Sequence, residues 1–152
     1  MSSTEGVEGY EISVDPARLD IDAMHAFLTR SYWSPGIPRA TVERAASHSL
    51  CFGLYQKAGG KQVGLTRVVT DHATFAYLCD VYVLEEHRGR GLGKWLMRVV
   101  TAHPCFTGAR RVMLGTLDAH GLYRQFGFSD AFGNKRLMEI VRPDIYRSPE
   151  TG

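Results

Sequence analysis

The segment HRGRGLGKW (residues 87–95) interleaves glycines with cationic side chains, which is a combination that can do chemistry. Glycine loses more conformational freedom on folding than any other residue, so a cluster of glycines indicates that the backbone must adopt a special path. Backbone N–H groups at the start of a helix bind anionic groups such as phosphate, and nearby cations strengthen that binding. The segment therefore predicts a site for an anion.

Three phosphate-binding patterns can be compared with this segment. The dinucleotide pattern G-x-G-x-x-G fails because Lys94 stands at its third glycine. The P-loop pattern G-x-x-x-x-G-K-[ST] fails because Arg88 replaces its first glycine and Trp95 its hydroxyl residue. The pattern [RQ]-x-x-G-x-[GA] is satisfied by Arg88, Gly91 and Gly93. Only this third pattern remains.

With this loop, the chain resembles the GNAT superfamily of acyl-CoA-dependent N-acetyltransferases. Residues 80–97 (DVYVLEEHRGRGLGKWLM) resemble its central strand, pyrophosphate loop and helix, and residues 118–128 (DAHGLYRQFGF) resemble a later helix. The order of elements agrees over residues 8–142. The resemblance implies an enzyme that uses acetyl-CoA and no metal to acetylate a primary amine of a small molecule, peptide or protein. The alternative is a non-catalytic acyl-CoA-binding sensor or interaction module.

The resemblance also assigns the residues that would hold acetyl-CoA. In the superfamily, backbone groups of the central strand bind the pantetheine arm, and amides of the glycine loop bind the pyrophosphate. The corresponding residues of this chain are Val81, Tyr82 and Val83 for the arm, and Gly89, Arg90, Gly91, Leu92, Gly93 and Lys94 for the phosphates. Arg88 is expected to brace the loop, while Arg90 and Lys94 add charge near the 3′-phosphate.

Acetyl transfer requires a proton donor for the departing thiolate and a route for the proton of the amine. Tyr123 matches the position where many superfamily members place the acid, and a phenol has a pKa near 10, close to that of a thiol. The alternative is a core tyrosine. Asp80 is the one charged residue on an apolar strand, and a buried carboxylate is costly unless it is paired. It is therefore a candidate base, or a structural partner of an arginine or a backbone group.

Two aromatic residues are candidates for binding the acceptor. Tyr32 and Trp33 lie in SYWSPGIPR (residues 31–39), where two prolines and a glycine prevent regular structure. They line the amine pocket or pack beneath this loop. The six histidines show no helical pairing and the three cysteines form no C-x-x-C pattern, so we expect no metal site.

Hydrophobic spacing and turn residues predict the elements that position these side chains. We expect strands near 10–14, 50–56, 62–70, 74–84, 110–116 and 136–141, the last preceded by a partner strand. We expect helices over 20–30, capped by Asp20, over 40–48, and from the glycines to about residue 103. Asp118 should cap a short helix that carries Tyr123. Both faces of 74–84 are apolar, which is typical of a central strand.

The fold class is therefore α/β (α+β). The resemblance implies a GNAT-like mixed, mostly antiparallel sheet of six to seven strands, about four flanking helices and a splayed central strand pair. One domain should span 8–146, with tails at 1–7 and 147–152.

Composition excludes some classes of partner. The 18 Lys and Arg nearly balance 16 Asp and Glu, which disfavours a nucleic-acid binder. No apolar run approaches the ~18 residues of a membrane span, and the polar, acidic N-terminus does not resemble a signal peptide. We expect a cytoplasmic monomer or homodimer.

Overall fold

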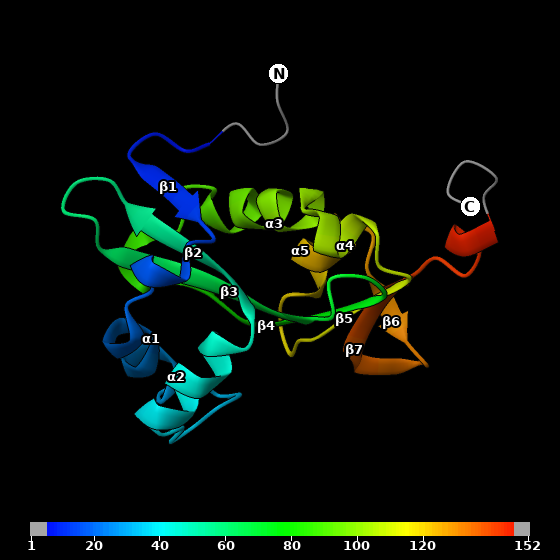
Figure 1. The fold of residues 1–152 in the computed structure, drawn as a ribbon, viewed down its shortest axis with the longest axis horizontal. Helices are drawn as coiled ribbons and strands as arrows, with labels where there is room; N and C mark the ends of the chain where they lie inside the picture. The colour runs from blue at the N-terminus through cyan, green and yellow to red at the C-terminus, as the bar shows by residue number, and fades with distance from the viewer. Residues whose placement is uncertain (1–5, 148–152) are drawn as a thin grey trace.

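The computed structural model describes residues 6–147, which form one sheet with helices on both faces (Figure 1). The strands are β1 (Tyr10–Ser13), β2 (Leu50–Gln56), β3 (Gln62–Thr70), β4 (Phe75–Val83), β5 (Arg111–Gly115), β6 (Ser129–Ala131) and β7 (Asn134–Val141). The α-helices are α1 (Ile21–Leu28), α2 (Arg39–Ser47), α3 (Leu92–Ala102), α4 (Pro104–Thr107) and α5 (His120–Arg124). The mixed fold and the number of strands confirm the sequence prediction.

The sheet has the order β1-β2-β3-β4-β5-β7-β6, and only β4 and β5 run parallel. Their register begins at Phe75 opposite Arg111 and ends at Leu78 opposite Leu114. On its other side, β4 stays paired with β3 as far as Val83. Residues 79–83 therefore have a neighbouring strand on one side only, and the predicted splay of the central pair is confirmed.

Alternation along the strands divides the core into two layers. On one face, Phe52, Leu78 and Val112 pack with residues of α3 and α4. On the other face, Cys51 and Tyr82 pack with α1 and α2. Figure 1 shows α3 and α4 on one side of the sheet and α1 and α2 on the other. The central strand is thus covered on both faces, as its apolar sequence predicted.

The predicted caps had different outcomes. The Asp20 side chain accepts a hydrogen bond from the Ala23 N–H (3.0 Å) and caps α1, as predicted. The prediction that Asp118 caps α5 is wrong, because Ala119 is the N-cap and no side chain bonds there. The Thr116 hydroxyl instead accepts the Ala119 N–H (3.0 Å), so this turn closes without Asp118. Helix α4, which begins at a proline after His103, was not predicted.

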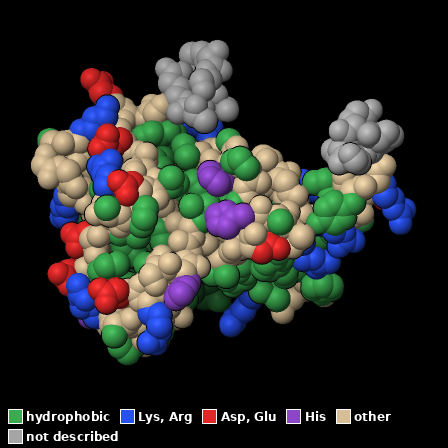
Figure 2. Space-filling view, in the orientation of Figure 1, with side chains coloured by type: hydrophobic (Ala, Val, Ile, Leu, Met, Phe, Trp, Pro, Cys, Tyr) green, Lys and Arg blue, Asp and Glu red, His purple; other side chains and the backbone are tan. Residues whose placement is uncertain are grey.

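The surface at the end of the sheet that carries β1, α1 and α2 is of mixed charge (Figure 2). Arg18 pairs with Glu11 and Arg39 with Asp22 there, at 2.7 and 2.6 Å. No helix within residues 6–147 has both the length and the apolar character needed to cross a membrane. Most of the two predicted tails, 1–5 and 148–152, lies outside the described residues.

Candidate active site

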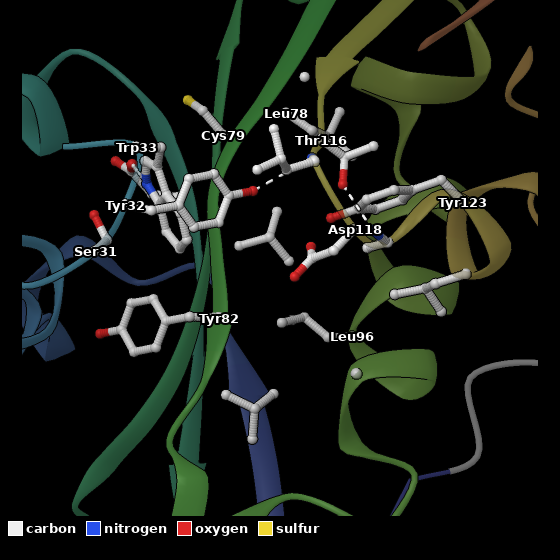
Figure 3. A pocket seen from close by; sticks show the side chains of 18 of the residues that line it. Ser31, Tyr32, Trp33, Leu78, Cys79, Tyr82, Leu96, Thr116, Asp118 and Tyr123 are labelled. Carbon is white, nitrogen blue, oxygen red and sulfur yellow. Dashed lines mark hydrogen bonds between the residues drawn. The ribbon is translucent and has the colours of Figure 1, made fainter. Parts of the chain in front are cut away.

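The splay of β4 from β5 opens a cavity of about 1030 Å³ that reaches both faces of the sheet. One wall is the open edge of β4, and the opposite wall is formed by the β5–α5 segment and by Tyr123 of α5 (Figure 3). The glycine loop and the start of α3 line one part of it, and the segment after α1 lines another. A long cavity of this kind can hold two reactants against one strand.

The glycine loop leaves a row of backbone donors free at the cavity wall. Gly89 and Gly91 have φ of 81° and 80°, a conformation that glycine adopts without a steric penalty. Within the described part of the chain, the N–H groups of residues 89–94 donate no hydrogen bond. No side chain caps α3 either, so its unpaired N–H groups make this end of the helix a binding site for an anion.

Arg88 ties the loop to the strand before it. Its Nε donates to the Val83 carbonyl oxygen at 2.8 Å, which bridges the end of β4 and the start of the loop. A guanidinium used in this way fixes the distance between the open strand edge and the free loop amides.

Asp80 lies at an irregularity in β4. Leu65 pairs with Tyr82 and Arg67 with Cys79, so Thr66 of β3 faces two residues, Asp80 and Val81. This is a β-bulge, and Asp80 takes a left-handed φ of 54° within it. A bulge bends its strand and increases the local twist, which accounts for the divergence of β4 from β5 at this point.

Both carboxylate oxygens of Asp80 are engaged. Oδ2 accepts from Arg67 Nε at 2.7 Å, and Oδ1 accepts from Trp33 Nε1 at 3.0 Å. Arg67 also donates to Ser49 Oγ at 3.0 Å. Asp80 is 8% exposed, so this is a largely buried ion pair that also holds the segment after α1.

Aromatic rings extend from β4 to the far wall of the cavity. Phe27 stacks on Tyr82 with ring centroids 3.9 Å apart, and Trp33 lies near Phe27. Tyr32 contacts Trp33 edge-on, and its hydroxyl accepts from the Leu117 N–H at 3.4 Å. Figure 3 shows Tyr32 spanning the space between β4 and the β5–α5 segment. Tyr32 and Trp33 are 56% and 39% exposed, so they form a wall and are not core residues.

Tyr123 presents its hydroxyl to the cavity from the other side (Figure 3). Its ring packs against Phe128, and the residue is only 6% exposed. Burial raises the pKa of Tyr123 to about 12, and the negative charge of Asp118 adds to this rise. Within residues 6–147, no protein group bonds the hydroxyl, so it is a neutral donor open to the cavity.

The structure brings together nearly all residues proposed from sequence. Those that line the cavity are Tyr32, Trp33, Asp80, Val81, Tyr82, Val83, Arg88, Gly89, Gly91, Leu92, Gly93 and Tyr123. Arg90 and Lys94 are exposed and are not part of this lining.

Sequence reasoning missed several polar residues of the cavity, among them Tyr77, Thr116 and Asp118. Thr116 and Asp118 follow the parallel strand β5, where the carboxyl ends of strands often carry functional residues. This position after β5 is the sequence signal that points to both residues, whereas the spacing before α5 predicts only a helix cap, at Asp118.

A splayed strand pair, a free-amide loop before a helix and a buried phenol across the gap are the features that the resemblance to acyl-CoA-dependent acyltransferases predicts. Residues 18–128 match the family model described as the acetyltransferase (GNAT) family. The chain belongs to this family, and it is an acyltransferase.

Similar proteins agree with this assignment. A protein from Xanthomonas campestris pv. campestris whose crystal structure is described as that of a GNAT-family acetyltransferase is 47% identical to this chain. The two structures agree with a TM-score of 0.79 over 94% of this chain and 100% of that chain. A protein from Gibberella zeae that is named as an acetyltransferase is 37% identical over 80% of both chains. A GNAT acetyltransferase from Elizabethkingia anophelis with acetyl-CoA bound shares 12% identity over 89% of this chain and 99% of that chain, at a TM-score of 0.65. This third likeness shows the fold alone.

Metal ligands are not gathered in the described part of the chain. No group of three or more His, Cys, Asp or Glu side chains within residues 6–147 could hold a metal ion. Cys51, Cys79 and Cys105 are free thiols.

Proposed function

We propose that this protein transfers the acetyl group of acetyl-CoA to a primary amine of a small molecule or peptide, with Tyr123 as the acid. The observation that carries the proposal is the single cavity that joins the free amides of the glycine loop to the Tyr123 hydroxyl along one open strand edge. The rings of Tyr32 and Trp33 line the same cavity and would bind the acceptor.

The residues present fit coenzyme A. The N–H groups of residues 89–94 would bind its pyrophosphate, and the unpaired edge at Val81–Val83 would pair with the pantetheine arm. Ideal Cβ atoms at Gly89, Gly91 and Gly93 would meet no protein atom within 4 Å, so glycine keeps open a space beside these amides. Exposed Arg90 and Lys94 would add positive charge at this end. When bound, acetyl-CoA supplies a thioester whose thiol is the leaving group.

Tyr123 would hold a proton at Oη and donate it toward the sulfur. Its pKa of about 12 keeps the hydroxyl protonated at neutral pH. Because a free thiol has a pKa near 8.5, full transfer from this phenol is uphill, and the hydroxyl acts mainly as a hydrogen-bond donor as charge develops. We therefore expect a contribution near the low end of the roughly 10²- to 10⁴-fold typical of a general acid.

For Asp80, the contacts support the structural role over that of a base. Both oxygens of Asp80 accept hydrogen bonds, one of them within the ion pair to Arg67, so taking up a proton would weaken contacts that hold this part of the fold together. We propose that Asp80 positions Trp33, and through it the aromatic wall, while Arg67 balances its charge.

Binding and turnover test the proposed function separately. A ligand that binds only the native state adds ~2.7 kcal/mol at 100 times its Kd. For a chain of this length, acetyl-CoA should thus raise Tm by roughly 5 to 10 °C, while NADH and ATP should shift it much less. Thiol release from acetyl-CoA is then measured with a set of primary amines. Equal shifts from all three nucleotides, or no release with any amine, would contradict the proposal.

A further inference from the structure

Two carboxylates line the cavity, and their surroundings differ. Asp80 is paired with Arg67 and bonded by Trp33. Asp118 is exposed to the cavity, and within residues 6–147 it takes part in no hydrogen bond or ion pair. The turn that it was expected to cap is closed by Thr116 instead. One carboxylate of the cavity is therefore left for a ligand.

The cations of the cavity form no ion pair with Asp118 among the described residues. Arg30, Arg88 and Arg136 also line the cavity, but none lies within 4.0 Å of the Asp118 carboxylate. Arg88 donates to the Val83 carbonyl, and Arg30 donates to the Ala26 carbonyl at 2.7 Å. An anionic side chain that the fold leaves unpaired in a cavity attracts a cation from outside.

Asp118 also lies next to the proposed acid. Figure 3 shows its carboxylate pointing into the cavity beside the Tyr123 hydroxyl, with Tyr32 opposite. Its charge adds to the rise of the pKa of Tyr123, which agrees with this proximity. The acceptor amine must reach this same part of the cavity, because it attacks the carbonyl carbon of the thioester whose departing sulfur receives the proton of Tyr123.

We propose that Asp118 binds the protonated amine of the acceptor beside Tyr123 and selects primary amines that arrive as cations. The bound ammonium then gives one proton to solvent water, and the neutral nitrogen attacks the thioester carbonyl as the thiolate leaves. This inference rests on the proposed function. A primary ammonium brings three N–H donors and a charge opposite to that of the carboxylate. Tyr32 and Trp33 offer aromatic faces to the carbon skeleton that carries this nitrogen, and such faces also attract cations. Asp118 is thus a specificity-determining residue in the acceptor part of the cavity.

The first test compares Michaelis constants. The acceptors are 2-phenylethylamine, Nα-acetyl-lysine amide and tetra-alanine, and the best of them is carried into the variants. Asp118→Asn keeps the shape and removes the charge, so the amine KM should rise about 10- to 100-fold, the range expected for a charged hydrogen bond. The KM for acetyl-CoA should stay within about twofold, since that ligand does not need this carboxylate. Asp118→Glu should recover part of the loss.

Two controls separate charge recognition from other effects. Glu8→Gln removes an exposed carboxylate that does not line the cavity, so the amine KM should not change. The alcohol analogue of the chosen amine, tested as a competitor, should inhibit the parent and Asp118→Asn equally, because it carries no charge. Added salt should raise the amine KM of the parent more than that of Asp118→Asn.

The outcomes distinguish this inference from the function on which it rests. Thiol release by the parent together with an unchanged amine KM in Asp118→Asn overturns the inference alone. So does a loss confined to kcat, which would mean that Asp118 acts on Tyr123 and not on the acceptor. Failure of the parent to release thiol with all three amines counts against the proposed function, and with it this inference.

Discussion

A substitution at Gly93 should stabilise the fold and weaken the binding of acetyl-CoA, the proposed ligand. It is the second residue of α3, and an ideal Cβ there would meet no atom within 4 Å. Replacing a helical glycine with glutamate gains roughly 0.6–1 kcal/mol of helix propensity. The first turn of α3 contains no acidic residue, so Gly93→Glu also gains about 0.3–1 kcal/mol from the helix dipole. Free protein should therefore melt roughly 2 to 8 °C higher.

The same substitution places a negative charge at the wall that we assign to the pyrophosphate. Two like unit charges about 5 Å apart repel by roughly 1–3 kcal/mol at effective dielectric constants of 80 to 20. The Kd for acetyl-CoA should then rise about 5- to 150-fold. Stability and affinity are thus expected to change in opposite directions, which a general defect in folding cannot produce.

The assay combines thermal melting of the free protein with calorimetric titration of acetyl-CoA. Gly121→Glu is the matched control, because Gly121 is the second residue of α5, is equally open to a Cβ and does not line the cavity. It should change Tm with the same sign and leave the Kd unchanged, while Gly93→Gln separates size from charge. A Gly93→Glu protein that binds acetyl-CoA as tightly as the parent would refute the assignment of this loop.

Three further predictions concern the cavity. Tyr123→Phe should lower the single-turnover rate about 100-fold with both KM values nearly unchanged, and a normal rate would make the hydroxyl structural. Because burial raises the pKa of Tyr123 to about 12, the kcat of the parent should not fall between pH 7 and 10. Trp33→Phe and Asp80→Asn should each raise the amine KM, and the KM of the double variant should not exceed that of the more affected single variant. Additive effects on the amine KM would show that the two residues act independently. Partial burial raises the pKa of the Cys79 thiol to about 12, so at pH 8 its alkylation by iodoacetamide should be at least about tenfold slower in native than in denatured protein, as mass spectrometry can measure. Equal labelling rates in native and denatured protein would contradict this raised pKa.

Much of the fold could be predicted from sequence because local signals and burial agreed. Asp20 precedes an amphipathic helix, and its side chain does cap α1. The apolar run of β4 is covered on both faces, as its composition indicated. The glycine loop was found because glycines at left-handed φ and cations at the start of a helix leave a clear mark in one short segment.

The partners of site residues could not be predicted, because they come from distant parts of the chain. Asp80 meets Arg67 and Trp33 only after β3 and β4 pair and the segment after α1 folds over them. Asp118 was misassigned for a related reason. Asp before a helix is a common N-cap, but here the Thr116 hydroxyl accepts the hydrogen bond from the Ala119 N–H. The Asp118 side chain is then free to point into the cavity.

The bulge at Asp80 links the opening of the sheet to the shape of the acceptor wall. A left-handed conformation costs a non-glycine residue roughly 1–2 kcal/mol, and a buried carboxylate adds a desolvation cost. The hydrogen bonds from Arg67 and Trp33 oppose both costs, because bonds to a charged group contribute about 1.5–3 kcal/mol each. The bond from Trp33 therefore does two things at once. It stabilises the bulge that parts β4 from β5, and it holds the aromatic segment across the gap that the bulge creates.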